Sequence, residues 1–133
     1  MPYQFINYII HQPHYPLRGG EIFILVTIFI IFARRVQMFI GVIKVCLHLS
    51  EPQSLKDKRR IIKGLTDRIK NKFNLAVAET GRMDSWNNSE LGIVCISNEA
   101  SHADSMLSRA INFIESQGTV ELTFVQTEII HFS

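Results

Sequence analysis

A chain of 133 residues and 15.3 kDa is long enough for one domain with its own hydrophobic core and too short for two ordinary domains. Its 47% hydrophobic and 20% charged residues are typical of a folded protein and exclude a largely disordered chain. The formal net charge of +2 is too small to indicate a nucleic-acid or membrane protein by itself, so any electrostatic argument depends on where the charges lie.

The two cysteines of the chain, Cys46 and Cys95, have no close spacing and no Cys-x-x-Cys arrangement. They therefore predict neither a disulfide framework nor a zinc site. Isolated thiols of this kind are typical of the interior of a protein in a reducing compartment, which favours a cytoplasmic location.

Residues 1–37 differ in composition from the rest of the chain. Within them, residues 22–32 form a run without a charge. As a helix this run would be ~17 Å long at ~1.5 Å per residue, against a hydrocarbon core of ~30 Å, so it is too short to cross a membrane. A secretory signal is not expected either, because a small-residue cleavage site is missing and Arg34 and Arg35 follow soon after the run.

We interpret residues 1–37 as an N-terminal apolar extension that is either flexible or the product of an over-extended gene reading, with translation beginning at Met38. If Arg34 and Arg35 were encoded by AGA-AGG, a purine-rich ribosome-binding sequence would precede the codon of Met38. Two alternatives remain open: a short anchor on a membrane surface, and a strand or helix that packs on the domain. If the extension is real, its apolar surface predicts poor solubility.

From Met38 onward the apolar pattern changes between strand and helix periods. Residues 39–49 alternate with period two between one apolar and one mixed face, which predicts a strand covered by helices on one side. Ser54 can cap the helix that follows, with Asp57 as a short capping-box partner. The core stripe of this helix consists of Leu55, Ile62, Leu65, Ile69 and Phe73.

The remaining pattern predicts strands over residues 75–80 and 91–97 joined by a polar hairpin loop, then a helix from Glu99 that Gly118 closes, and a final strand from Val120. We expect an irregularity of this last strand at Gln126 and Thr127. The order strand-helix-strand-strand-helix-strand predicts an α+β fold, the ferredoxin-like βαββαβ sandwich, with two helices on one face of a four-stranded antiparallel sheet.

The other face of the predicted sheet would be open and half apolar. From the first strand it would carry Ile40, Val42, Lys44, Cys46 and His48. An uncovered face of this kind suggests self-association, so Ile40, Val42 and Lys44 are candidate residues of a dimer face.

Several short segments after Met38 follow one another in a specific order. They are Ser54-Leu55-Lys56-Asp57-Lys58-Arg59-Arg60, Asp67-Arg68 to Phe73-Asn74, Ala76-Val77-Ala78-Glu79, Asp84-x-Trp86, Leu91-Gly92 and Ser97-Asn98. In this order and spacing, residues 38–133 resemble the YlxP-like family, domain of unknown function 503, and nothing before Met38 takes part. The resemblance implies a ferredoxin-like fold, a bacterial cytoplasmic setting, and genes frequently found among those for translation initiation and ribosome maturation. It implies no agreed activity and supplies no catalytic residues.

Positive charge is concentrated on the first helix of this domain. The helix carries eight Lys and Arg against Asp57 and Asp67, whereas residues 38–133 as a whole contain 11 Lys plus Arg and 11 Asp plus Glu. Five of the basic side chains project opposite the apolar stripe and form a candidate phosphate-binding strip, here called the basic strip: Lys56, Arg59, Arg60, Lys63 and Lys70. The alternative is that they only solvate the helix.

Four further residues are open to two interpretations. Lys58 projects onto the apolar side of the helix, where it either reaches outward or pairs with a carboxylate that the sequence does not identify. Asp84 and Trp86, in the hairpin loop, are candidate partner-binding residues, with the Trp anchoring a partner or stacking on a base. The alternative is a lid over one end of the core, with Asp84 making local turn hydrogen bonds. Glu79 is expected to point to solvent, although a buried carboxylate is the other possibility.

The common enzyme signatures are missing: there is no Gly-x-x-x-x-Gly-Lys, Gly-x-Gly-x-x-Gly, His-Glu-x-x-His or Gly-x-Ser-x-Gly. His48, His102 and His131 show no ligand spacing. We therefore expect no catalytic residues, no metal and no cofactor. The third strand also lacks the aromatic residues with which an RNA-recognition motif stacks on bases, so RNA binding by the sheet face is not expected.

The preferred hypothesis is a small non-enzymatic RNA- or ribosome-associated factor, linked to translation or ribosome maturation, that binds structured RNA or a ribosomal particle through the basic strip. No reading of a DNA sequence and no membrane partner are expected. The alternative is a dimeric protein-interaction or regulatory module that uses the open sheet face.

Overall fold

The computed structural model describes residues 18–35 and 37–133, which divide into two units at Met38. In the first unit, Gly19–Arg35 forms the helix α2, and its large apolar side chains, such as Phe23 and Phe32, are exposed. None of the described helices is long and apolar enough to cross a membrane. What the sequence suggests for residues 1–17 and Val36 lies outside the described residues. The described chain thus has three helices, because α2 adds to the two expected after Met38.

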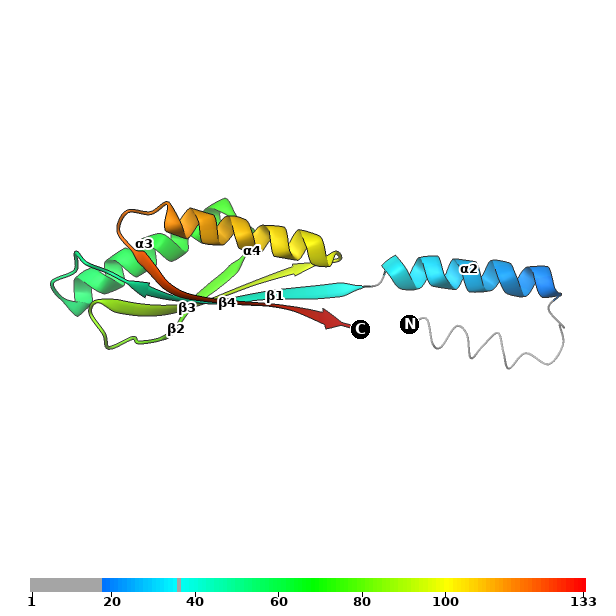
Figure 1. Ribbon diagram of the computed structural model, residues 1–133, viewed down its shortest axis with the longest axis horizontal. Coiled ribbons are helices and arrows are strands. Elements are labelled where there is room, and N and C mark those ends of the chain that lie inside the picture. Colours follow the sequence, from blue (N-terminus) through cyan, green and yellow to red (C-terminus); the bar gives the residue numbers. More distant parts are fainter. Residues whose placement is uncertain (1–17, 36) are drawn as a thin grey trace. The chain divides into compact units, whose positions relative to one another are not determined.

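The second unit, Met38–Phe132, contains one antiparallel sheet (Figure 1). Its strands are β1 (Met38–His48), β2 (Ala76–Gly81), β3 (Asn88–Ser97) and β4 (Glu121–Phe132). They are hydrogen-bonded in the order β2-β3-β1-β4, so β1 and β3 are central and β2 and β4 form the two edges. The predicted α+β class and four-stranded antiparallel sheet are confirmed.

Two helices, α3 (Leu55–Lys72) and α4 (Ala100–Glu115), lie on one face of this sheet (Figure 1). The predicted start of α3 is confirmed, because Ser54 Oγ accepts a hydrogen bond from Asp57 N at 3.1 Å. Asp57 in turn accepts one from Gln53 N at 3.3 Å, so both side chains satisfy amides at the helix start that have no partner within the helix.

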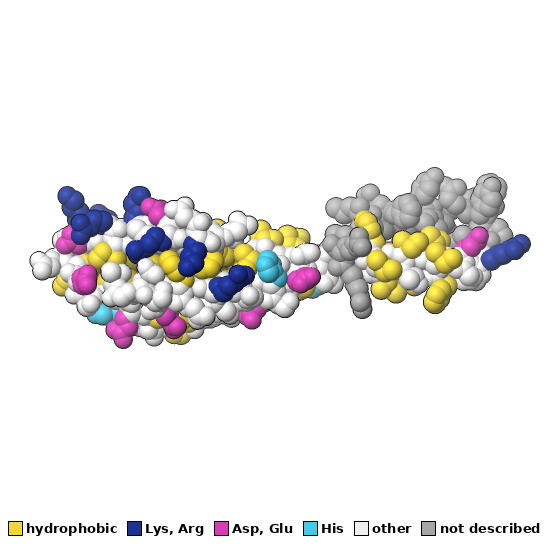
Figure 2. Space-filling view, turned by 90° about the horizontal axis from the view of Figure 1, so that it is seen from above, with side chains coloured by type: hydrophobic (Ala, Val, Ile, Leu, Met, Phe, Trp, Pro, Cys, Tyr) yellow, Lys and Arg dark blue, Asp and Glu magenta, His cyan; other side chains and the backbone are white. Residues whose placement is uncertain are grey.

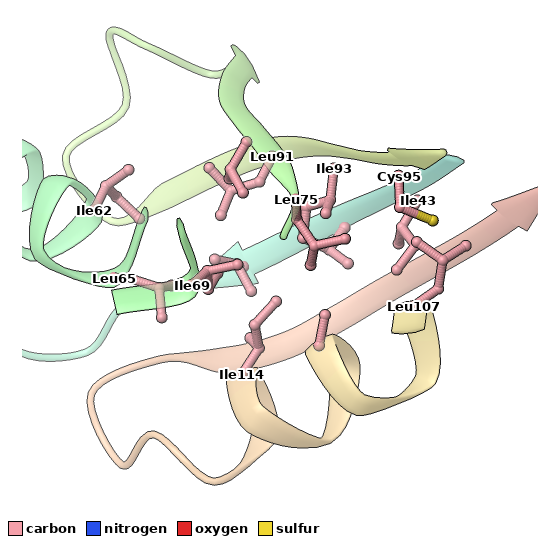
Figure 3. Close-up of a cluster of buried hydrophobic side chains, with 14 of the residues drawn as sticks. Ile43, Ile62, Leu65, Ile69, Leu75, Leu91, Ile93, Cys95, Leu107 and Ile114 are labelled. Atoms are coloured by element: carbon pink, nitrogen blue, oxygen red, sulfur yellow. The ribbon is translucent and has the colours of Figure 1, made fainter. Parts of the chain in front are cut away.

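The core lies between the sheet and the two helices (Figure 3). Most of the side chains that form it come from β1, β3, α3 and α4, and Val77 comes from β2. They include Ile43, Val45, Leu65, Ile69, Leu91, Ile93, Leu107 and Ile114. On β1 the buried residues are the odd-numbered ones, as the period-two pattern predicts. At Gly41, α4 packs directly on the strand: a Cβ there would lie 2.8 Å from Cys95 Sγ and 2.9 Å from Leu107 Cδ1.

One predicted detail of the sheet is wrong. Gln126 and Thr127 pair regularly with Lys44 and Ile43, and the irregularity lies instead where Cys46 pairs with Phe124 and Leu47 with Leu122. Thr123 is the extra residue there, and its hydroxyl donates to Cys46 O at 3.1 Å. The consecutive apolar residues Ile129 and Ile130 need no bulge, because Ile129 packs against the core while Ile130 is 40% exposed on the open face.

Candidate nucleic-acid interface

The amphipathic pattern of α3 places the basic strip on the surface. All five strip residues are exposed, while Ile62, Leu65 and Ile69 on the opposite side are buried. Figure 2 looks onto the domain from the helix side and shows several Lys and Arg side chains on this face. From Lys56 to Lys70 the strip is ~21 Å long at ~1.5 Å per residue, which is long enough to contact several successive phosphates.

Two members of the strip have acidic neighbours on the same helix. Arg60 Nη2 lies 3.9 Å from Asp57 Oδ1, and Lys63 Nζ lies 3.0 Å from Asp67 Oδ2. Both basic side chains are highly exposed, at 81% and 79%. Exposed pairs of this kind contribute only ~0.3–0.5 kcal/mol each, so a phosphate can replace the carboxylate at little cost. The strip is therefore only weakly neutralised.

A shallow hollow of about 260 Å³ lies between α3 and the edge strand β2. Arg59, Lys63 and Lys70 line it from the helix, together with Ile62 and Thr66, while Val77, Ala78 and Glu79 line it from the strand. The fold thus brings three of the five predicted phosphate-binding residues to one hollow. Lys56 and Arg60 are on the surface of the same helix but do not line the hollow.

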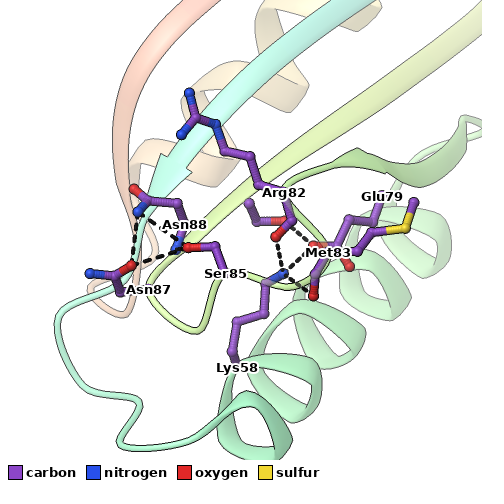
Figure 4. A network of polar contacts seen from close by, with 8 residues as sticks. Lys58, Glu79, Arg82, Met83, Ser85, Asn87 and Asn88 are labelled. Carbon is purple, nitrogen blue, oxygen red and sulfur yellow. Dashed lines mark hydrogen bonds and ion pairs between the residues drawn. The ribbon is translucent and has the colours of Figure 1, made fainter.

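Glu79, the acidic residue that lines this hollow, forms an ion pair with a buried lysine. Lys58 is fully buried, and its Nζ donates to Glu79 Oε1 and to the carbonyl oxygens of Arg82 at 3.0 Å and Met83 at 3.5 Å (Figure 4). Ser89 Oγ donates to the same Glu79 oxygen at 2.8 Å. Of the two interpretations of Lys58, pairing with a carboxylate is therefore the correct one. The expectation that Glu79 points to solvent is wrong, because its side chain is only 21% exposed.

This pairing has two consequences for the site. Because the charge of Lys58 balances that of Glu79, the net charge along the hollow comes from Arg59, Lys63 and Lys70. In addition, the contacts to two turn carbonyls fix the start of the β2–β3 hairpin, where Arg82 adopts a left-handed backbone conformation with φ of 57°. Such a conformation is uncommon for a residue other than glycine and is maintained here by the surrounding hydrogen bonds.

The hairpin loop itself is held by residues that the sequence did not single out. Ser85 N donates to Arg82 O at 3.0 Å, Asn88 N donates to Ser85 Oγ at 3.1 Å, and Asn88 Nδ2 donates to Asn87 Oδ1 at 2.8 Å (Figure 4). The predicted partner-binding residues Asp84 and Trp86 are both exposed, Trp86 at 51%. The loop thus presents an indole on a turn that Lys58 connects to the start of α3.

The second predicted surface is the open sheet face, for which β1 supplies the candidate residues Ile40, Val42 and Lys44. Ile40 and Val42 are half-buried and Lys44 is exposed, with its Nζ 3.3 Å from Glu90 Oε2 on β3. The pKa of Glu90 is lowered, mainly because the Thr80 hydroxyl donates to its carboxylate at 3.0 Å, and also because Lys44 lies beside it.

Among the histidines, His48 contacts Asn88, His102 contacts Ser97, and His131 stacks on Phe39.

Comparison with known proteins gives a family but no activity. The profile of a family described as "Protein of unknown function (DUF503)" matches residues 40–127. The "Uncharacterized protein YlxP" of Bacillus subtilis (strain 168) is 36% identical over 75 residues, which are 56% of this chain and 82% of that protein.

Two solved structures have a weaker likeness. The de novo designed protein Foldit4 is 14% identical, with a TM-score of 0.42 over 70% of this chain and 96% of its own. A structural-genomics protein, YJCS, is 13% identical, with a TM-score of 0.39 over 67% of this chain and 96% of its own.

Proposed function

Since the chain belongs to the DUF503 family of proteins of unknown function, we propose that it is a small non-enzymatic factor that binds structured RNA or a ribosomal particle through the phosphate backbone. The observation that supports this proposal is the distribution of charge: residues 38–133 carry equal numbers of basic and acidic residues, yet α3 gathers five exposed basic side chains on one flank. A location in the cytoplasm and a link to translation or ribosome maturation are part of the proposal and rest on the family resemblance.

We also propose that the domain is a ferredoxin-like sandwich. The support is the βαββαβ order of its elements, the strand order β2-β3-β1-β4, and the position of α3 and α4 on one face. In this arrangement α3 presents its outer side to solvent, and the strip is available to a large partner. The hollow beside β2 gives the backbone of such a partner a place to lie against Arg59, Lys63 and Lys70.

Charge reversal at one residue of the hollow tests this function. We expect Arg59→Glu to weaken binding to bacterial ribosomal RNA by ~10-fold or more, because it removes one phosphate contact and adds a repulsive charge. The matched control is Arg109→Glu, which makes the same change at an exposed position of α4. Binding would be measured by fluorescence anisotropy of labelled RNA at fixed salt. Equal losses for the two variants would overturn the proposal.

A further inference from the structure

The open sheet face carries a contiguous apolar cluster at one end. The strand registers place Ile40 between Ile130 of β4 and Ile96 of β3, and the next row contains Val42 and Val94. On the other side of the Ile40 row, Phe132 of β4 pairs with Met38 of β1. These side chains are well exposed: Ile96 at 64%, Phe132 at 60% and Ile130 at 40%. Large apolar residues that adjoin one another on a surface mark an interaction site, whereas single ones do not.

The polar residues of this face carry both signs of charge. Lys44, which is half exposed, lies one row beyond Val42 and beside Glu90, while the exposed Glu128 pairs in register with Val42. A surface that meets a copy of itself about a two-fold axis must be complementary to itself. A face with an apolar end and adjacent Lys and Glu side chains meets this condition, because Lys44 of one copy can face Glu128 of the other.

We propose that this face binds a second copy of the chain, sheet against sheet, over residues 38–46 of β1 and the strands beside it, with Ile40, Ile96, Ile130 and Phe132 as the apolar part of the contact. Four strands at ~4.8 Å and about nine residues at ~3.3 Å give a face of roughly 600 Å². Specific interfaces bury about 800 Å² per partner, and weaker ones bury less. The dimer is therefore reversible, and its population depends on protein concentration.

This inference does not rest on the proposed function, and the two surfaces do not compete. The helices α3 and α4 cover the other face of the sheet (Figure 1), so a sheet-to-sheet contact leaves both copies of the basic strip outward. A dimer would then have two phosphate-binding surfaces on opposite sides, and one dimer could engage two RNA segments with increased avidity.

The test is the molar mass of the full chain in solution over a range of concentrations, by sedimentation equilibrium. We expect a monomer–dimer equilibrium whose dissociation constant rises by ~10-fold or more with Ile96→Glu, because the carboxylate would lose water on burial in the contact. Met83→Glu changes a side chain of similar exposure, 52%, in the hairpin and should leave the equilibrium unchanged. Circular dichroism would show whether each variant is folded.

The apolar helix α2 requires its own variant, because its exposed side chains are another possible cause of association. Phe23→Glu, at a residue 74% exposed, should leave the dimer intact. Association that disappears with Phe23→Glu and persists with Ile96→Glu would overturn the proposal, and so would a strictly monomeric mass at every concentration. Either result would leave the RNA-binding proposal untouched.

A second readout comes from the two cysteines. Cys46 lies on the open face, in register with Glu90 and Phe124, whereas Cys95 is buried in the core, where burial raises the pKa of its thiol. We expect alkylation of Cys46 by iodoacetamide to slow as protein concentration rises, and Ile96→Glu to remove this dependence. A rate for Cys46 that does not change with concentration would contradict the proposed contact. The slow reaction of Cys95 serves as the internal measure of unfolding.

Discussion

At the scale of single residues, Lys58 connects α3 to the β2–β3 hairpin through Glu79 and two turn carbonyls. Its position on the apolar side of α3 can be predicted from helical periodicity alone, and its burial makes a carboxylate partner necessary. The partner, Glu79, is 21 residues away on another element, and nothing local in the sequence distinguishes it from the other acids. Sequence therefore identified the unusual lysine but not the pair.

We expect Lys58→Met to lower the free energy of unfolding by about 3 kcal/mol, because the carboxyl group of Glu79 would be left in a largely buried site without its cation. Lys44→Met is the matched control: Lys44 also pairs with a carboxylate, but it is 50% exposed, and the change should cost less than about 1 kcal/mol. Urea unfolding would measure both. Equal effects would mean that the buried pair does not hold the hairpin to α3.

The carboxyl group of Glu90 gives a pH-dependent prediction. Its pKa is lowered in the folded protein, so the stability that it contributes is present above the unfolded-state pKa of about 4.3 and is lost as pH falls through the lower folded value. Thr80→Val removes the largest cause and should raise the pKa of Glu90, which NMR titration of the side-chain carboxyl would show. Thr66→Val, on α3, serves as the control. A pKa of Glu90 that is the same in both variants would be inconsistent with this cause.

At the scale of elements, apolar period identified every strand and helix of the domain, because each element buries one regular face. The irregularity of β4 was predicted at the wrong place for a physical reason. Its apolar residues are Leu122, Phe124, Ile129 and Ile130, which occupy both even and odd positions, and the sequence does not say where the alternation between the two faces is interrupted. Only the pairing with β1 fixes that point at Thr123. The helix α2, before the domain, could not be predicted as a definite element, because an uncharged run of that length fits either a helix or a strand.

Two glycines in different elements test how closely α4 packs on the sheet. Gly41→Ala should destabilise the domain by about 1–3 kcal/mol, because the new methyl would overlap Leu107 and Cys95 in a closely packed core. Gly64→Ala makes the same change inside α3, where the methyl meets nothing within 4 Å, and should stabilise by about 0.5–1 kcal/mol. Thermal unfolding would measure both. Shifts of the same sign would contradict the packing of α4 on Gly41.

At the scale of the whole domain, the central feature is a balanced charge with a local excess on α3. The five strip residues could be named from sequence, because an amphipathic helix exposes the side opposite its apolar stripe. The hollow beside β2 could not, since it depends on how closely α3 approaches the edge strand. Nor could sequence show that Lys58 would balance the acid in that hollow. The residues of the strip thus follow from the local helical pattern, whereas the charges and the hollow around them depend on tertiary packing.

The most direct test of the proposed function is the dependence of RNA affinity on salt. A backbone-binding strip predicts a linear fall of log K with log salt concentration, and each of Arg59→Gln, Lys63→Gln and Lys70→Gln should reduce the slope by about 1. Arg109→Gln on α4 should leave the slope as it is. Affinity that is insensitive to salt, or a slope that the three strip variants do not change, would contradict the account.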